Sequence, residues 1–308
     1  MPPEPPRSPE ETGLIIQREA GLVTLPNGGS PALSEMISRS LVHLQTSKAL
    51  AVAERRAGDE CDFEIAPGVM MRMCWIPPGE FVMGSPKDEL GRSLWQTQHR
   101  VTITQGFWLG KYEVTQAQWQ AVMGSNPSYF KNANLPVEQV SWDDISEPGG
   151  FVAAANCFAP ADWRFSLPTE AQWEYACRAG TTTALNSGKN LTSREGACPH
   201  LDEVAWYDEN SGGMTHPGGL KMANACGLHD MHGNLWEWCA DWADWTGDYP
   251  TGPVADPLGS DSRSCRRVAR GGAWVNGAYD CRAAARANSY PATSGRHVGF
   301  RLARITVH

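Results

Sequence analysis

The sequence GLHDMHGNLWEW at residues 227–238 is the most informative part of this chain for its fold. Near its end, Trp236 and Trp238 are separated by the single residue Glu237. Because successive residues of a strand point to opposite faces of a sheet, both indole rings fall on one face. Core packing is the expected role of these rings, since a buried Trp removes a large apolar area from water. The stretch therefore predicts a strand with one buried aromatic face.

Two further motifs lie on the C-terminal side of this stretch. RGGAW occupies residues 270–274, and GFRL occupies residues 299–302. The paired glycines Gly271 and Gly272 permit a backbone geometry that a Cβ atom would obstruct. Short apolar runs bounded by turn residues predict strands at 70–76, 80–83, 100–103, 107–109, 268–270 and 298–303.

Two helices are expected on the N-terminal side of the stretch. In LPTEAQWEYA, residues 167–176, Thr169 follows a proline and can cap a helix that stops at Gly180. Thr115 can cap an earlier helix over 115–123, which Gly124 stops. Short strands, few helices and many turn residues predict a mixed architecture with long loops.

Composition limits the class of protein. The chain has 308 residues, a net charge of -8, 13 Trp, 31 Gly and 22 Pro. This acidity argues against a nucleic-acid partner, which a basic stripe would attract. The apolar runs are shorter than the ~18 residues of a membrane span, and the Pro-rich start lacks the apolar core of a signal peptide, so we expect a cytoplasmic protein. Nine Cys without a C-x-x-C pair indicate buried free thiols.

Three segments of the chain differ in character. Residues 1–30 are rich in Pro, Glu and Gly, and are predicted to form a mobile arm. Residues 31–60 are predicted to form a helical extension, because apolar residues recur there at helical spacing. Residues 61–308 contain the strand-like runs and turn clusters, and are predicted to form the folded domain.

Taken in order, the motifs resemble the formylglycine-generating-enzyme, or sulfatase-modifying factor, family. The chain contains the family's motifs in the family's order: IPPGEFVMGS at 76–85, KYEVT at 111–115, PVEQVSW at 136–142, LPTEAQWEYA at 167–176, GLHDMHGNLWEW at 227–238, RGGAW at 270–274 and GFRL at 299–302. The resemblance implies an irregular C-type-lectin-like fold of the α+β class, with short antiparallel strands, two or more helices and long loops. The family comprises oxidases that convert a sulfatase cysteine to formylglycine, iron enzymes that form C–S bonds, and non-catalytic binding proteins. Fold alone therefore does not give the function.

The resemblance also locates the copper(I) site of the oxidases. Two Cys, five residues apart, bind the ion in the segment after Arg-Gly-Gly. In this chain the first Cys position falls on Asn276 and the second on Cys281. Copper(I) requires soft thiolates, and a neutral amide cannot replace one. We therefore expect no catalytic residues, no enzymatic activity and no copper, with Cys281 as a thiol of the core.

Iron is the second catalytic alternative. His229, Asp230 and His232 could be drawn as a facial triad. The family's iron enzymes, however, take their three His largely from a separate helical domain, and only His43 precedes the folded domain here. The simpler interpretation is that these three residues fill family positions that tolerate any polar or aromatic side chain.

The 227–238 stretch also resembles the family's calcium site. The match assigns side-chain oxygens to Asp230 and Glu237, and backbone carbonyls to Gly233 and Leu235. Calcium favours such a mixture of carboxylates and carbonyls in a bent loop, so a structural calcium ion is predicted here. The alternative is that both acids simply accept backbone hydrogen bonds.

Between Trp274 and Val298 the residue types change. The segment 275–297 contains no Lys, Glu, Gln, Met or Trp. These five types make up about a fifth of the chain, so roughly four such residues would be expected by composition. The pattern resembles the variable region of proteins diversified by retroelements, in which mutagenesis at template adenines yields none of the five. A chance composition in a surface loop is the alternative.

Variable proteins of that kind use the C-type-lectin-like fold and carry the variable side chains on one exposed surface. We therefore expect a non-catalytic protein whose diversified C-terminal surface binds a variable protein ligand, without nucleic acid or a membrane segment. A copper-dependent oxidase of protein cysteine, and an inactive scaffold or regulatory subunit, are the alternatives. The predicted ligand-binding residues are Val275, Asn276, Gly277, Tyr279, Asp280, Ala285, Ala287, Asn288, Ser289, Tyr290, Ser294, Arg296 and His297. The resemblance assigns a constant framework to the residues that separate or border them, namely Trp274, Ala278, Cys281, Arg282, Ala283, Arg286, Pro291, Gly299, Phe300 and Arg301.

Overall fold

The computed structural model describes residues 55–243, 252–259 and 265–307. The predicted arm at 1–30 and the predicted helical extension up to residue 54 lie outside the described residues. Residues 56–308 form one compact unit. Its first strand, β1, begins at Glu60, one residue before the start predicted for the folded domain.

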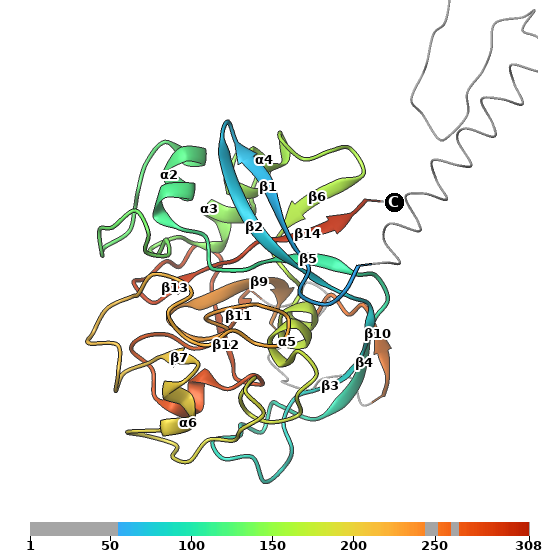
Figure 1. The fold of residues 1–308 in the computed structure, drawn as a ribbon, viewed down its shortest axis with the longest axis vertical. Coiled ribbons are helices and arrows are strands. Elements are labelled where there is room, and N and C mark those ends of the chain that lie inside the picture. Colours follow the sequence, from blue (N-terminus) through green and yellow to red (C-terminus); the bar gives the residue numbers. More distant parts are fainter. Residues whose placement is uncertain (1–54, 244–251, 260–264, 308) are drawn as a thin grey trace, which may run out of the picture. The chain divides into compact units, whose positions relative to one another are not determined.

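A five-stranded sheet forms one side of this unit and has the order β1-β2-β5-β14-β6 (Figure 1). In its second strand, Met71 and Met73 are buried whereas Arg72 between them is exposed, as a period-2 pattern requires. All four strand pairings in this sheet are antiparallel. The strands are β1 (Glu60–Ala66), β2 (Val69–Ile76), β5 (Phe107–Gly110), β14 (Ala303–Thr306) and β6 (Trp163–Ser166).

The other sheets are smaller. A four-stranded sheet has the order β12-β11-β9-β13, a three-stranded sheet the order β10-β4-β3, and β7 pairs with β8. The four-stranded sheet comprises β12 (Arg286–Ser289), β11 (Arg267–Arg270), β9 (Trp236–Trp242) and β13 (Val298–Gly299). The rest are β10 (Val254–Ala255), β4 (His99–Ile103), β3 (Gly79–Met83), β7 (Ala205–Trp206) and β8 (His232–Gly233).

The predicted strand at 298–303 is wrong as a single element. The structure divides this run into β13 and β14, which belong to different sheets. Between them, the Phe300 and Leu302 carbonyls accept hydrogen bonds from the backbone of Val114 and Gly110. Arg301 is fully buried between these two residues. The backbone therefore leaves one sheet and joins the next where this arginine enters the interior.

The two predicted helices are confirmed with their caps. Thr115 caps α2 (Gln116–Met123) and Thr169 caps α5 (Glu170–Arg178), each through a reciprocal capping box. Gly124 ends α2 in the left-handed conformation, whereas α5 ends at Ala179 with φ 44°, one residue before the predicted glycine. The shorter helices are α3 (Trp142–Ser146), α4 (Phe151–Asn156), α6 (Pro199–Asp202) and the 3-10 turn η2 (Ala278–Cys281).

The predicted aromatic face of residues 236–238 is confirmed. Trp236 and Trp238 lie in β9, and both belong to one hydrophobic core cluster with Phe300. Glu237 points the other way, where its carboxylate accepts from the indole N–H of Trp173 at 2.7 Å. Strand β9 thus separates an aromatic core from a buried polar layer.

Candidate functional site

The segment after Arg-Gly-Gly is held by a close approach that only glycine permits. Gly272 has φ 77°, and a Cβ placed there would lie 2.6 Å from the Cys281 sulfur and 2.8 Å from the Asp280 carbonyl oxygen. Gly271 also has a positive φ, of 101°. The turn η2, which packs directly on Gly272, explains the need for that glycine, whereas a Cβ at Gly271 would lie 3.2 Å from the Trp173 ring.

Arginines at framework positions anchor the segment to glutamates elsewhere in the chain. Arg286 of β12 makes a two-point ion pair with Glu170 of α5, with N–O distances of 2.5 and 2.8 Å. Arg270 pairs with Glu174 one helical turn further along. These glutamates are buried, so the pairs hold β11 and β12 rigidly on α5.

The predicted ligand-binding residues differ in exposure. Val275 and Tyr290 are 51% and 50% exposed. Others that are exposed or half-buried are Asn276, Gly277, Tyr279, Asp280, Ala287, Asn288, Ser289, Ser294, Arg296 and His297. The neighbouring framework residues Ala278, Cys281 and Ala283 are fully buried. Along most of the segment, the predicted ligand-binding residues are thus exposed or half-buried, whereas these framework residues are buried.

Ala285 is the exception, and its inclusion among the ligand-binding residues is wrong. Only 3% of its surface is exposed, and its side chain lies in the hydrophobic core cluster that contains Trp238. Its carbonyl accepts a hydrogen bond from buried Arg270. A methyl side chain suits a surface or a core equally well, so the residue type carried no signal of its burial.

Two stretches of the segment that are far apart in sequence meet at Trp274. The Trp274 indole donates to the Arg296 carbonyl at 2.8 Å, and the backbone N–H of Trp236 donates to the His297 carbonyl at 2.9 Å. The Trp236 indole donates to the Asn276 side chain at 2.9 Å. Residues 275–276 and 296–297 therefore border the same tryptophans.

The other predicted residues form two further groups. Tyr279 and Asp280 lie on η2, beside Arg194 and the yellow helix α6 (Figure 1). Residues 288–290 lie at β12, where Arg266 covers the Tyr290 ring at 4.6 Å. Strands β12 and β13 are the two edges of the four-stranded sheet, so the β12 group and residues 296–297 lie at opposite edges. The three groups are residues 275–276 with 296–297, residues 279–280, and residues 288–290. That they form one continuous surface stays a prediction.

The two residues at the copper positions are both engaged in the protein. Asn276 accepts from Trp236 and donates to the Asp280 carboxylate at 2.8 Å. Cys281 is fully buried, and burial raises the pKa of its thiol far above the usual range. A buried, protonated thiol is a structural feature, and the expected role of Cys281 as a core thiol fits this position.

His232 is also committed to internal hydrogen bonds. Its Nδ1 lies 2.7 Å from the Cys281 carbonyl, to which it donates, and its Nε2 accepts from the Asn186 backbone N–H at 3.0 Å. Burial lowers the pKa of this imidazole to about 4, so the ring is neutral at pH 7. With both nitrogens engaged, His232 holds η2 in place and has no nitrogen left for iron.

The predicted calcium ligands do not form a fitting donor set. Both oxygens of Glu237 accept from Arg301 at 2.6 Å, which leaves no free carboxylate edge for a cation. Asp230 accepts from the Gly219 backbone with one oxygen, and its other oxygen is buried without a hydrogen-bond partner among the described residues. Calcium takes six to eight oxygens, so these two carboxylates do not fit the ion as they are bonded here. The calcium site at Asp230, Gly233, Leu235 and Glu237 stays a prediction that their geometry does not support.

Sequence reasoning missed the importance of Arg301. It is fully buried and faces a group of carboxylates that also includes Glu113. Burial, together with the charges of Glu237 and Asp230, holds the pKa of Glu113 well above its usual range, although Arg301 opposes this effect. Within residues 55–243, 252–259 and 265–307, no three His, Cys, Asp or Glu are grouped to hold a metal.

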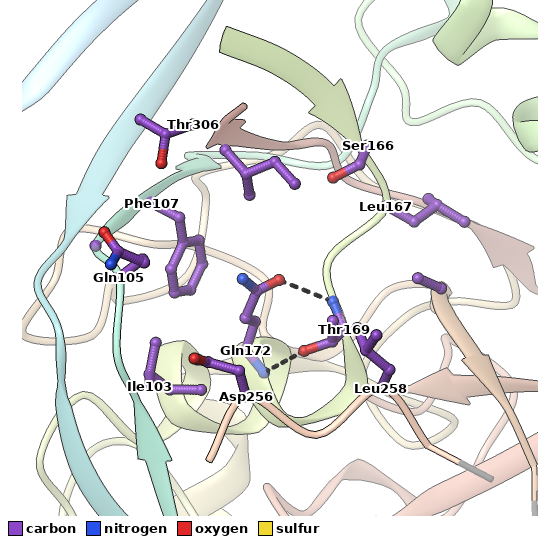
Figure 2. A pocket seen from close by; sticks show the side chains of 13 residues that line it. Ile103, Gln105, Phe107, Ser166, Leu167, Thr169, Gln172, Asp256, Leu258 and Thr306 are labelled. Atoms are coloured by element: carbon purple, nitrogen blue, oxygen red, sulfur yellow. Dashed lines mark hydrogen bonds between the residues drawn. The ribbon is translucent and has the colours of Figure 1, made fainter. Parts of the chain in front are cut away.

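A pocket lies apart from the predicted surface, between the five-stranded sheet and the start of α5 (Figure 2). It has a volume of about 290 Å³ and is lined by apolar side chains that include Ile103, Phe107 and Leu167. Of its polar residues, Thr169 and Gln172 are hydrogen-bonded to each other as the capping box of α5. The other polar residues of the lining are Gln105, Ser166, Asp256 and Thr306. The lining is mainly apolar.

Comparison with known proteins assigns the family. A model of the sulfatase-modifying factor enzyme 1-like domain matches residues 64–306. The chain belongs to this family. Among curated relatives, a formylglycine-generating enzyme of Thermomonospora curvata is 35% identical over 62% of this chain and 62% of its own length. The chaperone protein LppX of Paenibacillus barcinonensis is 32% identical over 55% of this chain and 70% of its own length.

A solved structure extends the similarity. The chain resembles Treponema denticola variable protein 1 with a TM-score of 0.67 and 28% identity, covering 79% of this chain and 98% of that one. This likeness confirms the α+β, C-type-lectin-like fold. The chain spans less than two thirds of the length of the formylglycine-generating enzymes it matches. No helix in the described part of the chain has the length and apolar character needed to cross a membrane.

A buried carboxyl gives a pH-dependent prediction. Burial, and next the charge of Glu170, raise the pKa of Asp241 to about 7 in the folded protein. The contribution of Asp241 to the free energy of unfolding is therefore fully present below pH 4 and is lost as the pH rises through 7, by up to about 4 kcal/mol. Asp241→Asn should remove this loss, because the amide oxygen can still accept from the Glu170 backbone.

The measurement is urea unfolding of both proteins at pH 5 and pH 8. We expect the variant to be more stable than the wild type at pH 8, with a smaller difference at pH 5. An equal difference at the two pH values would show that Asp241 does not titrate in this range.

Proposed function

We propose that this protein is a non-catalytic ligand-binding protein whose surface at about 275–297 is diversified by a retroelement. The observation that carries the proposal is the coincidence of composition with exposure. The segment lacks five residue types, and apart from Ala285 its predicted variable residues are exposed or half-buried. The arginines at its framework positions are paired with buried glutamates that lie outside it. The likeness to Treponema denticola variable protein 1 supports the same function.

Ligand binding is tested by selection against a defined probe. The full chain is displayed with the predicted variable residues other than Ala285 randomised, and binders to purified lysozyme are selected. We expect binders that melt within a few degrees of the wild type, because surface substitutions usually change stability by less than about 0.5 kcal/mol each. Tyr279 and Tyr290 should recur as Tyr or other aromatic residues in binders, since rigid aromatic side chains supply most of the contact area.

A control library randomises the exposed positions of β1 and β2, which lie outside the predicted surface. We expect far fewer binders from this library. If the two libraries perform equally, or if members of the first fail to fold, residues 275–297 are not a specialised binding surface.

Diversification itself is tested in the DNA. We expect a near-copy of the sequence encoding about 270–304 downstream of the gene, with adenines at the variable codons and a neighbouring reverse transcriptase gene. If no such copy exists, diversification by a retroelement is wrong, whereas the proposal of ligand binding is unaffected.

Copper-dependent oxidation is the second candidate function, because the family includes such enzymes. We expect no sub-micromolar copper(I) site in an anaerobic titration, since Asn276 supplies an amide and Cys281 is buried. Turnover of a sulfatase-motif peptide by the wild type would contradict this expectation and restore the enzymatic function.

A further inference from the structure

The loop at 85–96, outside the variable segment, is closed at its base. The backbone N–H of Ser85 donates to the Gln96 carbonyl at 3.0 Å, and their side chains are also hydrogen-bonded at 3.0 Å. Both residues are buried, with 1% and 2% of their surface exposed. Turn hydrogen bonds from Glu89 and Arg92 follow within the loop. The 85–96 loop is therefore a defined structural element.

Arg282 clamps this loop to the variable segment. Its guanidinium donates to the Glu89 carboxylate at 2.5 Å, to the Gly91 carbonyl at 2.7 Å and to the Gln96 side chain at 3.0 Å. Its Nε donates in the other direction, to the carbonyl of Tyr279 in η2, at 2.9 Å. Only 2% of each side chain in the Arg282–Glu89 pair is exposed, so water does not weaken it.

The backbones approach closely at the same place. Gly91 has φ 81°, and a Cβ there would lie 2.7 Å from the Cβ of Tyr279. A side chain at Gly91 would thus force the loop away from a predicted variable residue. The loop therefore packs directly against η2 at Gly91 and Tyr279.

Large apolar side chains project from this rigid loop into solvent. Leu94 is 79% exposed, Trp95 is 52% exposed and Leu90 is 43% exposed. Exposed apolar side chains on a loop that is anchored by hydrogen bonds are typical of an interaction surface. Trp is among the residues enriched at interface hot spots. The loop lies outside 275–297, so diversification of that segment would leave its residues unchanged.

We propose that the 85–96 loop is the constant half of the ligand-binding surface, and that Leu94 and Trp95 dock against an apolar patch of the protein ligand. This inference rests on the proposed function. The variable residues of η2 then select the ligand by polar contacts, while the loop supplies apolar contact area that every ligand shares. Arg282 is the positioning residue, because its hydrogen bonds fix the loop relative to η2.

The test uses lysozyme and carbonic anhydrase as probes, with several independent binders selected against each from the library of residues 275–297. Leu94→Ser and Trp95→Ser are introduced together into every binder. We expect Kd to rise at least ~10-fold in most binders of both probes, whatever their variable residues, because an apolar anchor is lost. The melting temperature should not change, since both side chains are exposed.

Leu220→Ser is the matched control, because Leu220 is 62% exposed and belongs neither to the loop nor to the variable segment. It should leave Kd unchanged. Binders that tolerate the double substitution would overturn the proposal while leaving the proposed function intact. Failure to obtain any binder would instead contradict the proposed function. A wild-type dimer that the double substitution converts to a monomer would assign the loop to self-association and overturn its role toward a ligand.

Discussion

Replacing Arg301 with Met is expected to lower the free energy of unfolding by about 3–5 kcal/mol. The arginine is fully buried and donates to both oxygens of Glu237 at 2.6 Å. It also donates to the carbonyls of Gly110 and His229, at 2.9 and 3.0 Å. Its loss leaves Glu237 unpaired in the interior, beside the buried acids Glu113 and Asp230. Thermal and urea unfolding measure the effect, and the melting temperature should fall by roughly 10 °C.

Two further variants show whether the buried pair causes this loss. Glu237→Gln combined with Arg301→Met should cost at least about 1 kcal/mol less than the sum of the two single changes, because the paired charges are removed together. Arg72→Met breaks the exposed pair with Asp62 and should cost less than about 1 kcal/mol. If Arg301→Met is no more destabilising than Arg72→Met, the buried pair does not organise the core.

Gly272→Ala is expected to destabilise the protein by about 2–5 kcal/mol. An L-residue at φ 77° costs about 1–2 kcal/mol, and the added methyl would overlap the Cys281 sulfur and the Asp280 carbonyl oxygen, which adds about 1–3 kcal/mol. The turn η2 must shift to relieve the overlap. Binders selected on the 275–297 surface should therefore lose affinity as well as stability.

Gly68→Ala is the matched control for this change. Gly68 has a similar φ of 71°, but no atom lies within 4 Å of the added Cβ. Gly68→Ala should lower the free energy of unfolding only by the cost of an L-residue in the left-handed conformation, about 1–2 kcal/mol. It should leave ligand binding unchanged. Equal losses in the two variants would show that η2 does not press on the Gly271–Gly272 backbone.

Local patterns were enough to predict several elements of this fold. Thr115 and Thr169 start helices because their hydroxyls accept from backbone N–H groups within the same turn. Trp236 and Trp238 share a buried face because strand geometry alternates side chains. These interactions join residues within a few positions of each other, so their spacing in the sequence is sufficient to reveal them.

The candidate site was predicted less completely, because exposure depends on what packs above a residue. Composition located the segment 275–297, and most of its predicted residues are exposed or half-buried. Composition also placed Ala285 on the surface, whereas it is buried in the hydrophobic core cluster that contains Trp238. The exposed loop with Leu94 and Trp95 carried no signal of its nearness to η2, because almost two hundred residues separate Arg282 from its partner Glu89.

The family, the capped helices, the aromatic strand and the segment in which residue types change could all be predicted from the amino-acid sequence. The three-dimensional structure was needed to show that 298–303 divides between two sheets, that Arg301 neutralises the acid predicted to hold calcium, and that 275–276 and 296–297 border the same tryptophans. The two sets of features differ in the range of the interactions that produce them. Caps and strand alternation act over a few residues, whereas ion pairs, sheet order and burial join residues that only the folded chain brings together.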